Sequence, residues 1–158
     1  KSYKEKGKAR LWEFYRLHEN NWPSPIALEM NFKIKIGKYS VRGQIDRVDC
    51  LPDGTVEIID YKTGSMPDKL DKWNKYQLLI YQLGVEEVLN KKVSQVSFYY
   101  LEENKKISFV GDGDSLVKLK EEILEKIGEI LKNEFAPKPS QFSCKFCDYK
   151  EICEWREY

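Results

Sequence analysis

The sequence predicts an α/β fold in which a central mixed sheet is flanked by helices. Apolar and polar residues alternate in three consecutive segments, which favours an antiparallel meander of three strands. A helical stripe separates this meander from two further strand-like segments, and another helical stripe follows them. The predicted strands are 26–38, 41–50, 55–61, 93–101 and 105–110, and the predicted helices are 1–21, 69–89 and 116–135.

The composition is that of one soluble globular domain. The chain has 158 residues, of which 41% are hydrophobic and 34% are charged. No apolar run approaches the roughly 20 residues of a membrane span, and Lys1–Arg10 lacks the apolar core of a signal peptide. We therefore expect a cytoplasmic protein with no membrane partner. The net charge of +1 excludes a polycation that binds nucleic acid by bulk attraction, but clustered lysines can still form a local track.

The first predicted helix ends before Trp22-Pro23-Ser24-Pro25, because proline cannot continue a helix. His18, the only histidine, lies at the end of this helix. We interpret it as a half-buried residue beside Trp22 rather than as a metal ligand.

The stretch Gly43–Lys62 has the pattern of a β-hairpin closed by the turn Pro52-Asp53-Gly54. Asp60 and Lys62 are two residues apart on its second strand, so both side chains lie on the same face. Asp46 lies near the middle of the first strand. Two carboxylates and one ammonium therefore converge if the hairpin closes at this turn.

These side chains suit the hydrolysis of phosphodiesters. Asp46 and Asp60 offer hard oxygen ligands for magnesium or manganese, and the main-chain carbonyl of Tyr61 offers a third. The metal would activate a water and neutralise charge in the transition state, while Lys62 would orient that water. The alternative is an exposed charge pattern across the strands. The apolar pair Ile58-Ile59 argues instead for a buried strand, in which charge needs a role.

The helix that follows the hairpin carries Gln77 and Tyr81 on one face, since they are four residues apart. A role at the site and simple packing both stay open for this pair. The last helix has Asp114 or Ser115 as its expected N-cap.

Three of the four cysteines, Cys144, Cys147 and Cys153, lie close together near the C-terminus, whereas Cys50 stands alone. Disulfides are rare in cytosolic proteins, so we expect the three to ligate a metal or a cluster. Thiolates suit zinc or iron–sulfur.

Three motifs in this order resemble the PD-(D/E)xK nuclease superfamily, and specifically its RecB-like branch. They are GQIDRVD at 43–49, IIDYKTG at 58–64 and QLLIY at 77–81, and the resemblance extends from about Glu29 to the C-terminus. It implies a restriction-endonuclease-like sheet.

The resemblance also implies a role for each residue of these motifs. Asp46 and Asp60 would be metal ligands, and Lys62 would be the catalytic lysine. Gln77 and Tyr81 would support the site or contact the DNA backbone. Asp49, at the second acidic position of the first motif, would be structural.

The cysteine spacing resembles the C-terminal triplet of the iron–sulfur members of this branch, which include helicase-nucleases of the AddB/UvrD type and CRISPR-associated adaptation exonucleases. This resemblance favours a 4Fe-4S cluster, with zinc as the alternative. Those relatives have a fourth cysteine and a metal-binding histidine before the core, and neither Cys50 nor His18 matches them. We therefore expect an N-terminally truncated RecB-like core at 1–140 and a cysteine motif at 141–158.

The expected function is that of an Mg- or Mn-dependent deoxyribonuclease, an exonuclease or end-processing enzyme acting on single strands or duplex ends of DNA. The resemblance implies repair or recombination, as the C-terminal part of a helicase-nuclease with its motor in the same polypeptide or complex. Two alternatives stay open. One is a stand-alone exonuclease of the CRISPR-adaptation type. The other is a catalytically idle domain that binds single-stranded DNA for a helicase through Lys62, Lys69, Lys72, Lys75, Trp73 and Tyr76.

Overall fold

The structure, a computed structural model, describes residues 2–157. Contacts divide the chain into two compact units, Lys1–Leu124 and Glu125–Tyr158. The helices and strands in chain order are α1 (Ser2–His18), β1 (Pro25–Ile36), β2 (Tyr39–Cys50), β3 (Val56–Lys62), α2 (Lys72–Leu89), β4 (Val93–Tyr100), β5 (Lys105–Phe109), α3 (Gly113–Leu131) and α4 (Gln141–Lys145). Among the helices of residues 2–157, none combines the length and apolarity that crossing a membrane requires.

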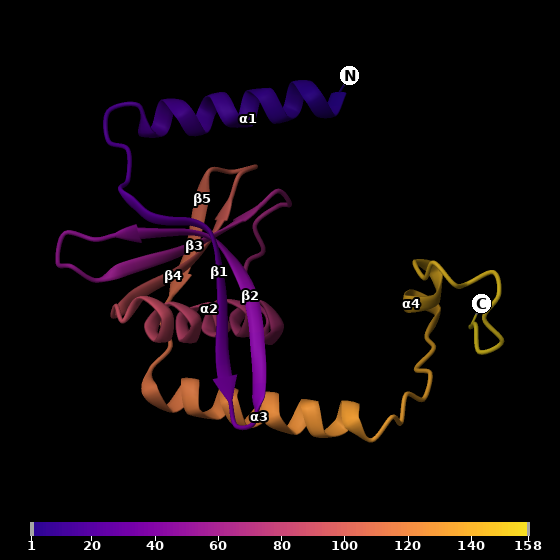
Figure 1. Cartoon of the computed structure of the whole chain (residues 1–158). Coiled ribbons are helices and arrows are strands. Elements are labelled where there is room, and N and C mark those ends of the chain that lie inside the picture. The colour runs from indigo at the N-terminus through magenta and orange to yellow at the C-terminus, as the bar shows by residue number, and fades with distance from the viewer. Residues whose placement is uncertain (1, 158) are drawn as a thin grey trace. The chain divides into compact units, whose positions relative to one another are not determined.

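The five strands form one sheet in the order β1-β2-β3-β4-β5 (Figure 1). The first three strands form an antiparallel meander, and β5 pairs antiparallel with β4. Only β3 and β4 run parallel, and α2 makes the crossover between them, because parallel neighbours need a long connection. The predicted α/β fold with a mixed central sheet and flanking helices is confirmed.

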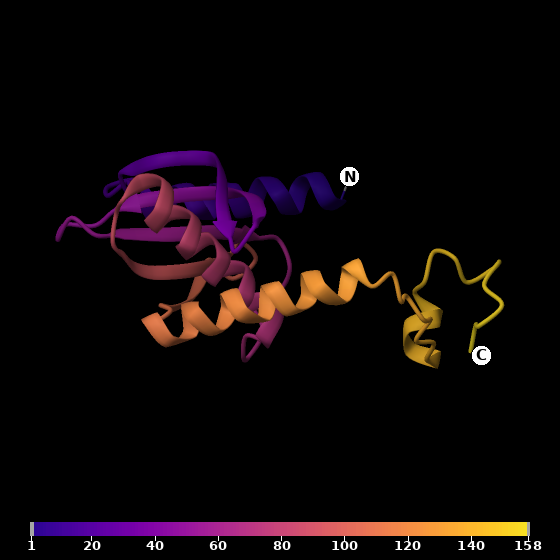
Figure 2. The ribbon, with the colours of Figure 1, turned by 60° about the horizontal axis from the view of Figure 1, so that its bottom comes forward.

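One face of the sheet is covered by α2, which contacts β1, β3 and β4 (Figures 1 and 2). The helix begins after Asp71, whose side chain accepts a hydrogen bond from the N–H of Asn74 at 2.7 Å. Leu78, Leu79 and Leu83 are buried against the strands. Burial of each such leucine contributes roughly 1.5–3 kcal/mol, so the α2 interface holds the core of the first unit together.

The ring of Phe32 on β1 lies between two glycines. A Cβ atom would stand only 2.5 Å from this ring at Gly43 and 2.8 Å from it at Gly84. Glycine at both positions therefore lets β1, β2 and α2 close around one aromatic ring. The ring also makes an edge contact with Tyr81 of α2, at 6.0 Å between centroids.

The burial of β1 does not follow its apolar alternation over the whole strand. Glu29 has a φ of 48°, in the left-handed region that non-glycine residues rarely adopt. After this residue Phe32, Ile34 and Ile36 are buried, whereas Leu28 before it is 61% exposed. Glu29 thus separates a core half of β1 from an exposed half.

The opposite face of the sheet is approached by α1. Its Phe14 ring makes edge contacts with Tyr61 on β3 and Tyr99 on β4, at centroid distances of 6.1 and 5.5 Å. His18 is half-buried, with its ring 5.7 Å from that of Trp22 and its Nδ1 2.8 Å from the carbonyl oxygen of Phe14. This placement is the one expected from the sequence.

The helix α3 begins earlier than its apolar pattern indicated. Asp112 Oδ1 accepts a hydrogen bond from the N–H of Ser115 at 2.8 Å, so Asp112 is the capping residue rather than Asp114 or Ser115. The three residues before Leu116, at positions 113–115, carry no apolar side chain that could have marked the start of the helix. Leu119 of this helix is buried in the core of the first unit.

The second unit contains the end of α3 and the single turn of α4. Ser140 caps α4, since its hydroxyl accepts the N–H of Ser143 at 3.1 Å. Most of the aromatic side chains of this unit are exposed, namely Phe135, Phe142, Phe146, Tyr149 and Trp155.

Candidate active site

The candidate site lies at the carboxyl end of β3, under the N-terminal half of α2. Asp60 and Lys62 project from β3 toward this helix. Gln77 of α2 forms hydrogen bonds with both of them and with Tyr81, which lies one turn further along the helix. The carboxyl ends of strands that precede a crossover helix are where open α/β sheets bind their ligands. The topology therefore gathers the predicted polar residues at a place suited to a substrate.

Asp60 is a buried carboxylate, 4% exposed, that directly follows the apolar pair Ile58-Ile59 of β3. Its Oδ1 accepts a hydrogen bond from Gln77 Nε2 at 3.0 Å, and its Oδ2 lies 2.7 Å from Lys62 Nζ. Burial raises the pKa of Asp60 above its usual value; the contact with Lys62 opposes this rise and the nearby charge of Asp46 adds to it. The folded chain thus holds this carboxylate where its charge is only partly compensated.

Lys62 is the cation of the site and is about one third exposed. Besides Asp60, it donates a hydrogen bond to Gln77 Oε1 at 3.2 Å. Its Nζ also lies over the ring of Phe98, 4.7 Å from the ring centroid. Three neighbours from three different elements therefore define the position of this ammonium, which still reaches solvent.

Gln77 joins the charged residues to Tyr81. Its Oε1 accepts from Lys62, while its Nε2 donates to Asp60 and to Tyr81 Oη, the last at 3.0 Å. Only this orientation of the amide matches an ammonium donor and a carboxylate acceptor at the same time. Burial is the main cause that raises the pKa of Tyr81, which keeps its hydroxyl protonated.

Asp46 reaches the group from β2. Its Oδ2 accepts a hydrogen bond from the main-chain N–H of Tyr61 at 2.9 Å, so the carboxylate is tied to the peptide between Asp60 and Lys62. The structure thus brings together all five side chains predicted from the sequence, Asp46, Asp60, Lys62, Gln77 and Tyr81, beside the main chain of Tyr61.

The donor atoms of this group fit a hard divalent cation. Asp60 Oδ2 is buried and accepts no hydrogen bond, because the nearby Lys62 makes an ion pair without hydrogen-bond alignment. Asp46 and Asp60 supply carboxylate oxygens, which are the ligands that magnesium and manganese prefer. Within residues 2–157, however, no group of three or more His, Cys, Asp or Glu side chains is arranged to hold a metal. Any further ligands would have to be main-chain oxygens, water or substrate.

The three C-terminal cysteines do not form such a group. Cys144, Cys147 and Cys153 are free thiols, each half-buried, spread over α4 and the turns that follow it. In the part of the chain that the structure describes, they are not arranged as a shared ligand set. The predicted 4Fe-4S cluster, and zinc as its alternative, therefore find no support in this structure, because proximity in sequence has not brought the thiols together in space.

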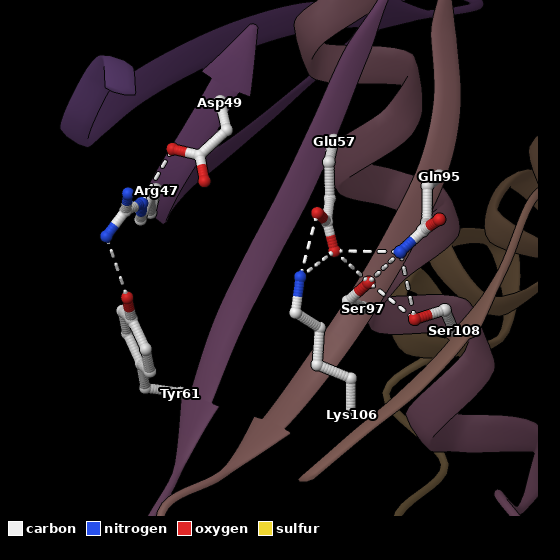
Figure 3. Close-up of polar contacts among 8 residues, drawn as sticks. All are labelled: Arg47, Asp49, Glu57, Tyr61, Gln95, Ser97, Lys106 and Ser108. Atoms are coloured by element: carbon white, nitrogen blue, oxygen red, sulfur yellow. Dashed lines mark hydrogen bonds and ion pairs between the residues drawn. The ribbon is translucent and has the colours of Figure 1, made fainter. Parts of the chain in front are cut away.

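The face of the sheet that points away from α2 carries two polar groups that the sequence did not reveal (Figure 3). Arg47 Nε donates to Asp49 Oδ1 at 2.6 Å, and its Nη1 donates to Tyr61 Oη at 3.3 Å. Asp49 is thus engaged in a buried ion pair, in keeping with a structural role. The second group surrounds the buried Glu57, which pairs with Lys106 at 2.8 Å.

Sequence reasoning also missed the ring of Phe98 beneath Lys62. Asp60 and Phe98 are register partners in the parallel pairing of β3 with β4. No spacing along the chain could have revealed this contact, because the two strands are separated by the whole of α2.

The fold of this chain, rather than its site, has a counterpart among known proteins. No curated protein matches the sequence. Among solved structures, a candidate exonuclease from Eubacterium rectale superposes with a TM-score of 0.65 at 13% identity, covering 100% of this chain and 63% of its own. This chain thus spans less than two thirds of that protein. The protein named SSO0001 superposes with a TM-score of 0.48 at 19% identity, covering 96% of this chain and 69% of its own.

A comparison with protein-family models identifies the superfamily of the chain. The family model of the PD-(D/E)XK nuclease superfamily matches residues 2–154, which is nearly the whole chain. The chain therefore belongs to the PD-(D/E)XK nuclease superfamily.

Proposed function

We propose that this chain is a DNA-cleaving nuclease domain of the RecB-like branch that hydrolyses phosphodiester bonds with magnesium or manganese. The observation that carries the proposal is the cluster of Asp60, Lys62 and Gln77, in which a buried carboxylate meets an ammonium at 2.7 Å. Charge of this kind is costly to bury, and Asp60 differs from the buried Glu57 in that one of its oxygens, Oδ2, accepts no hydrogen bond. Support for the branch comes from the order of the three motifs that contain these residues.

Asp46 and Asp60 would hold the divalent cation. When bound, the cation activates a water and neutralises charge that develops on the phosphoryl group. Asp60 offers its buried Oδ2, which accepts no hydrogen bond, and Asp46 offers the oxygen that is not bonded to Tyr61. The hydrogen bond from Tyr61 fixes the orientation of the Asp46 carboxylate before any ligand arrives.

Lys62 would contact the scissile phosphate. Its ammonium is partly exposed, so a non-bridging phosphate oxygen can reach it without displacing the core. Gln77 holds both Lys62 and Asp60 through one amide, and Tyr81 holds Gln77. These two residues would keep the spacing between cation, lysine and substrate constant during turnover.

The proposed substrates are single strands or duplex ends of DNA, cleaved during repair or recombination in the cytoplasm. We assign residues 1–140 to the nuclease core and 141–158 to the cysteine motif, within a longer helicase-nuclease. A 4Fe-4S cluster has no part in the proposal, since the described thiols do not form a ligand set.

The test uses the full-length protein with Mg²⁺ or Mn²⁺ and end-labelled single-stranded and duplex DNA. Asp60→Asn and Lys62→Met should each lower kcat by a factor of about 10² or more, because the first removes a charged ligand of the cation and the second removes the ammonium placed at the reacting phosphate. The matched control is Lys91→Met, which removes an exposed lysine outside the site. Cleavage that survives both site variants unchanged would refute the proposed site.

A second candidate function is DNA binding without cleavage, in support of an attached helicase. It is favoured by the shortage of acidic ligands, because the described residues present only two carboxylates at the site. The expected lysine track is weaker than the sequence indicated, since Lys72 pairs with Glu122 at 2.7 Å. Salt-dependent binding without metal-dependent cleavage would favour this function.

Motor motifs upstream in the full-length chain would exclude the stand-alone, CRISPR-adaptation type of exonuclease.

A further inference from the structure

The aromatic ring of Phe98 forms the floor under the Lys62 ammonium. The distance of 4.7 Å from Nζ to the ring centroid is within the range of a cation–π contact. The Phe98 side chain is fully buried in the core. Its ring therefore cannot turn away from the ammonium without disturbing the packing around it.

The ring of Phe98 attracts the Lys62 ammonium without accepting one of its N–H donors. An ammonium has three N–H donors; Gln77 accepts from one of them at 3.2 Å, while the Asp60 carboxylate lies 2.7 Å away as an ion-pair partner without hydrogen-bond alignment. The face of an aromatic ring attracts a cation through its quadrupole and needs no aligned N–H. Phe98 can hold the charge in place while one donor of Lys62 stays available on the open side.

A lysine side chain has four rotatable bonds and, at one-third exposure, would otherwise sample several positions. A fixed ring beneath Nζ reduces that freedom before substrate binds. Register explains why this ring is the one used, since Phe98 lies opposite Asp60 in the parallel β3–β4 pair. Strand pairing thus places the carboxylate and the ring on neighbouring strands, both in contact with the lysine head.

We propose that Phe98 is a positioning residue for the nuclease reaction: its ring face holds the Lys62 ammonium so that one N–H donor is free for the scissile phosphate. This inference rests on the proposed function of the site. It assigns a role in turnover to a side chain that acts through Lys62.

The test replaces Phe98 in the full-length protein by phenylalanines with one, two and three ring fluorines. Fluorination withdraws electron density from the ring face with little change in shape, whereas Phe98→Leu would also leave a cavity. We expect kcat to fall stepwise, by about threefold to thirtyfold in total, because the contact weakens in steps. KM should stay within about twofold and the melting temperature should stay constant, since neither depends on this contact.

The control is the same fluorine series at Phe109, which packs against the same core from β5. There kcat should not change. A constant kcat across the Phe98 series, or an equal fall in the Phe109 series, would overturn the proposal.

A second measurement needs no catalysis. The ¹⁹F resonance of a fluorinated ring at position 98 should move when Lys62→Met removes the ammonium, and should stay in place with Lys91→Met. A resonance that does not respond to Lys62→Met overturns the contact, whether or not the protein cleaves DNA. If the protein cleaves no DNA, the proposed function fails, and the contact is judged by this resonance alone.

Discussion

The main-chain N–H of Tyr61 donates a hydrogen bond to the Asp46 carboxylate at 2.9 Å, at the point where regular pairing between β2 and β3 ends. The register runs from Cys50 opposite Val56 to Arg47 opposite Ile59. Beyond it a side-chain oxygen takes the place of a main-chain acceptor. One oxygen of Asp46 thus continues the sheet while the other remains for the site.

Two substitutions of Asp46 should distinguish its contribution to folding stability from its contribution to cleavage. Asp46→Asn keeps an oxygen that can accept from Tyr61 but loses the charge, so folding stability should be retained while cleavage falls by a factor of about 10² or more. Asp46→Ala loses both the charge and the acceptor for the Tyr61 N–H, so its free energy of unfolding should be lower by about 1 kcal/mol. Urea titrations and cleavage assays on both variants decide this. Equal stability of the two variants would show that the hydrogen bond to Tyr61 contributes nothing.

Gln77 should matter for turnover more than for folding. Gln77→Leu removes the donor to Asp60 and the acceptor of Lys62, so kcat should fall by about tenfold to a hundredfold as both groups lose their fixed positions. Single-turnover cleavage measures the effect. The matched control is Gln82→Leu on the same helix, whose amide bonds the main chain of Gly111. That variant should lose stability but keep its activity per folded molecule.

Divalent cations should stabilise the fold through the two aspartates. At a concentration of about 100 Kd, a ligand that binds only the folded state adds about 2.7 kcal/mol, so Mn²⁺ should raise Tm by several degrees. Asp46→Asn and Asp60→Asn should abolish this increase, whereas Asp114→Asn, an exposed control, should keep it. Calorimetry with and without Mn²⁺ provides the measurement. An unchanged increase in the site variants would place the metal elsewhere.

The Glu57 cluster on the other face should support folding and not cleavage (Figure 3). The Glu57 carboxylate accepts from Lys106, Ser97 and Gln95, at 2.8, 2.6 and 2.9 Å. Lys106→Met leaves this buried carboxylate without its cation and should destabilise the protein by about 1–3 kcal/mol. The double variant with Glu57→Gln should recover part of that loss. Activity per folded molecule should match wild type, and a selective loss of kcat would contradict this assignment.

The N-cap of α3 should contribute a pH-dependent part of the stability. Hydrogen bonds from the side chain and main chain of Ser115 lower the pKa of Asp112. A folded pKa below the unfolded one adds stability above the unfolded pKa, and this stability is lost as pH falls through the folded pKa. Asp112→Ser keeps a neutral cap, so wild type should be more stable at neutral pH and lose its advantage in acid. A pH-independent difference in urea unfolding would rule out the charge as its origin.

The sequence by itself determined the elements of the fold and the candidate site. Apolar periods of two and of three to four residues distinguish strands from helices, so the meander, the crossover helix and the mixed sheet were predictable. Side chains two apart on a strand share a face, which already placed Asp60 beside Lys62. The motif order around them predicted the nuclease superfamily to which the chain belongs.

Only the tertiary structure decided how these parts meet. Phe98 lies under Lys62 because of the register between two parallel strands, and Glu29, in the left-handed region, separates the exposed half of β1 from its buried half. The C-terminal cysteines had a suggestive spacing and are nevertheless not gathered into a ligand set within the described residues. The physical reason is the same in each case. Local patterns report the periodicity of one segment, whereas register and ligand geometry depend on packing between segments that are distant in sequence.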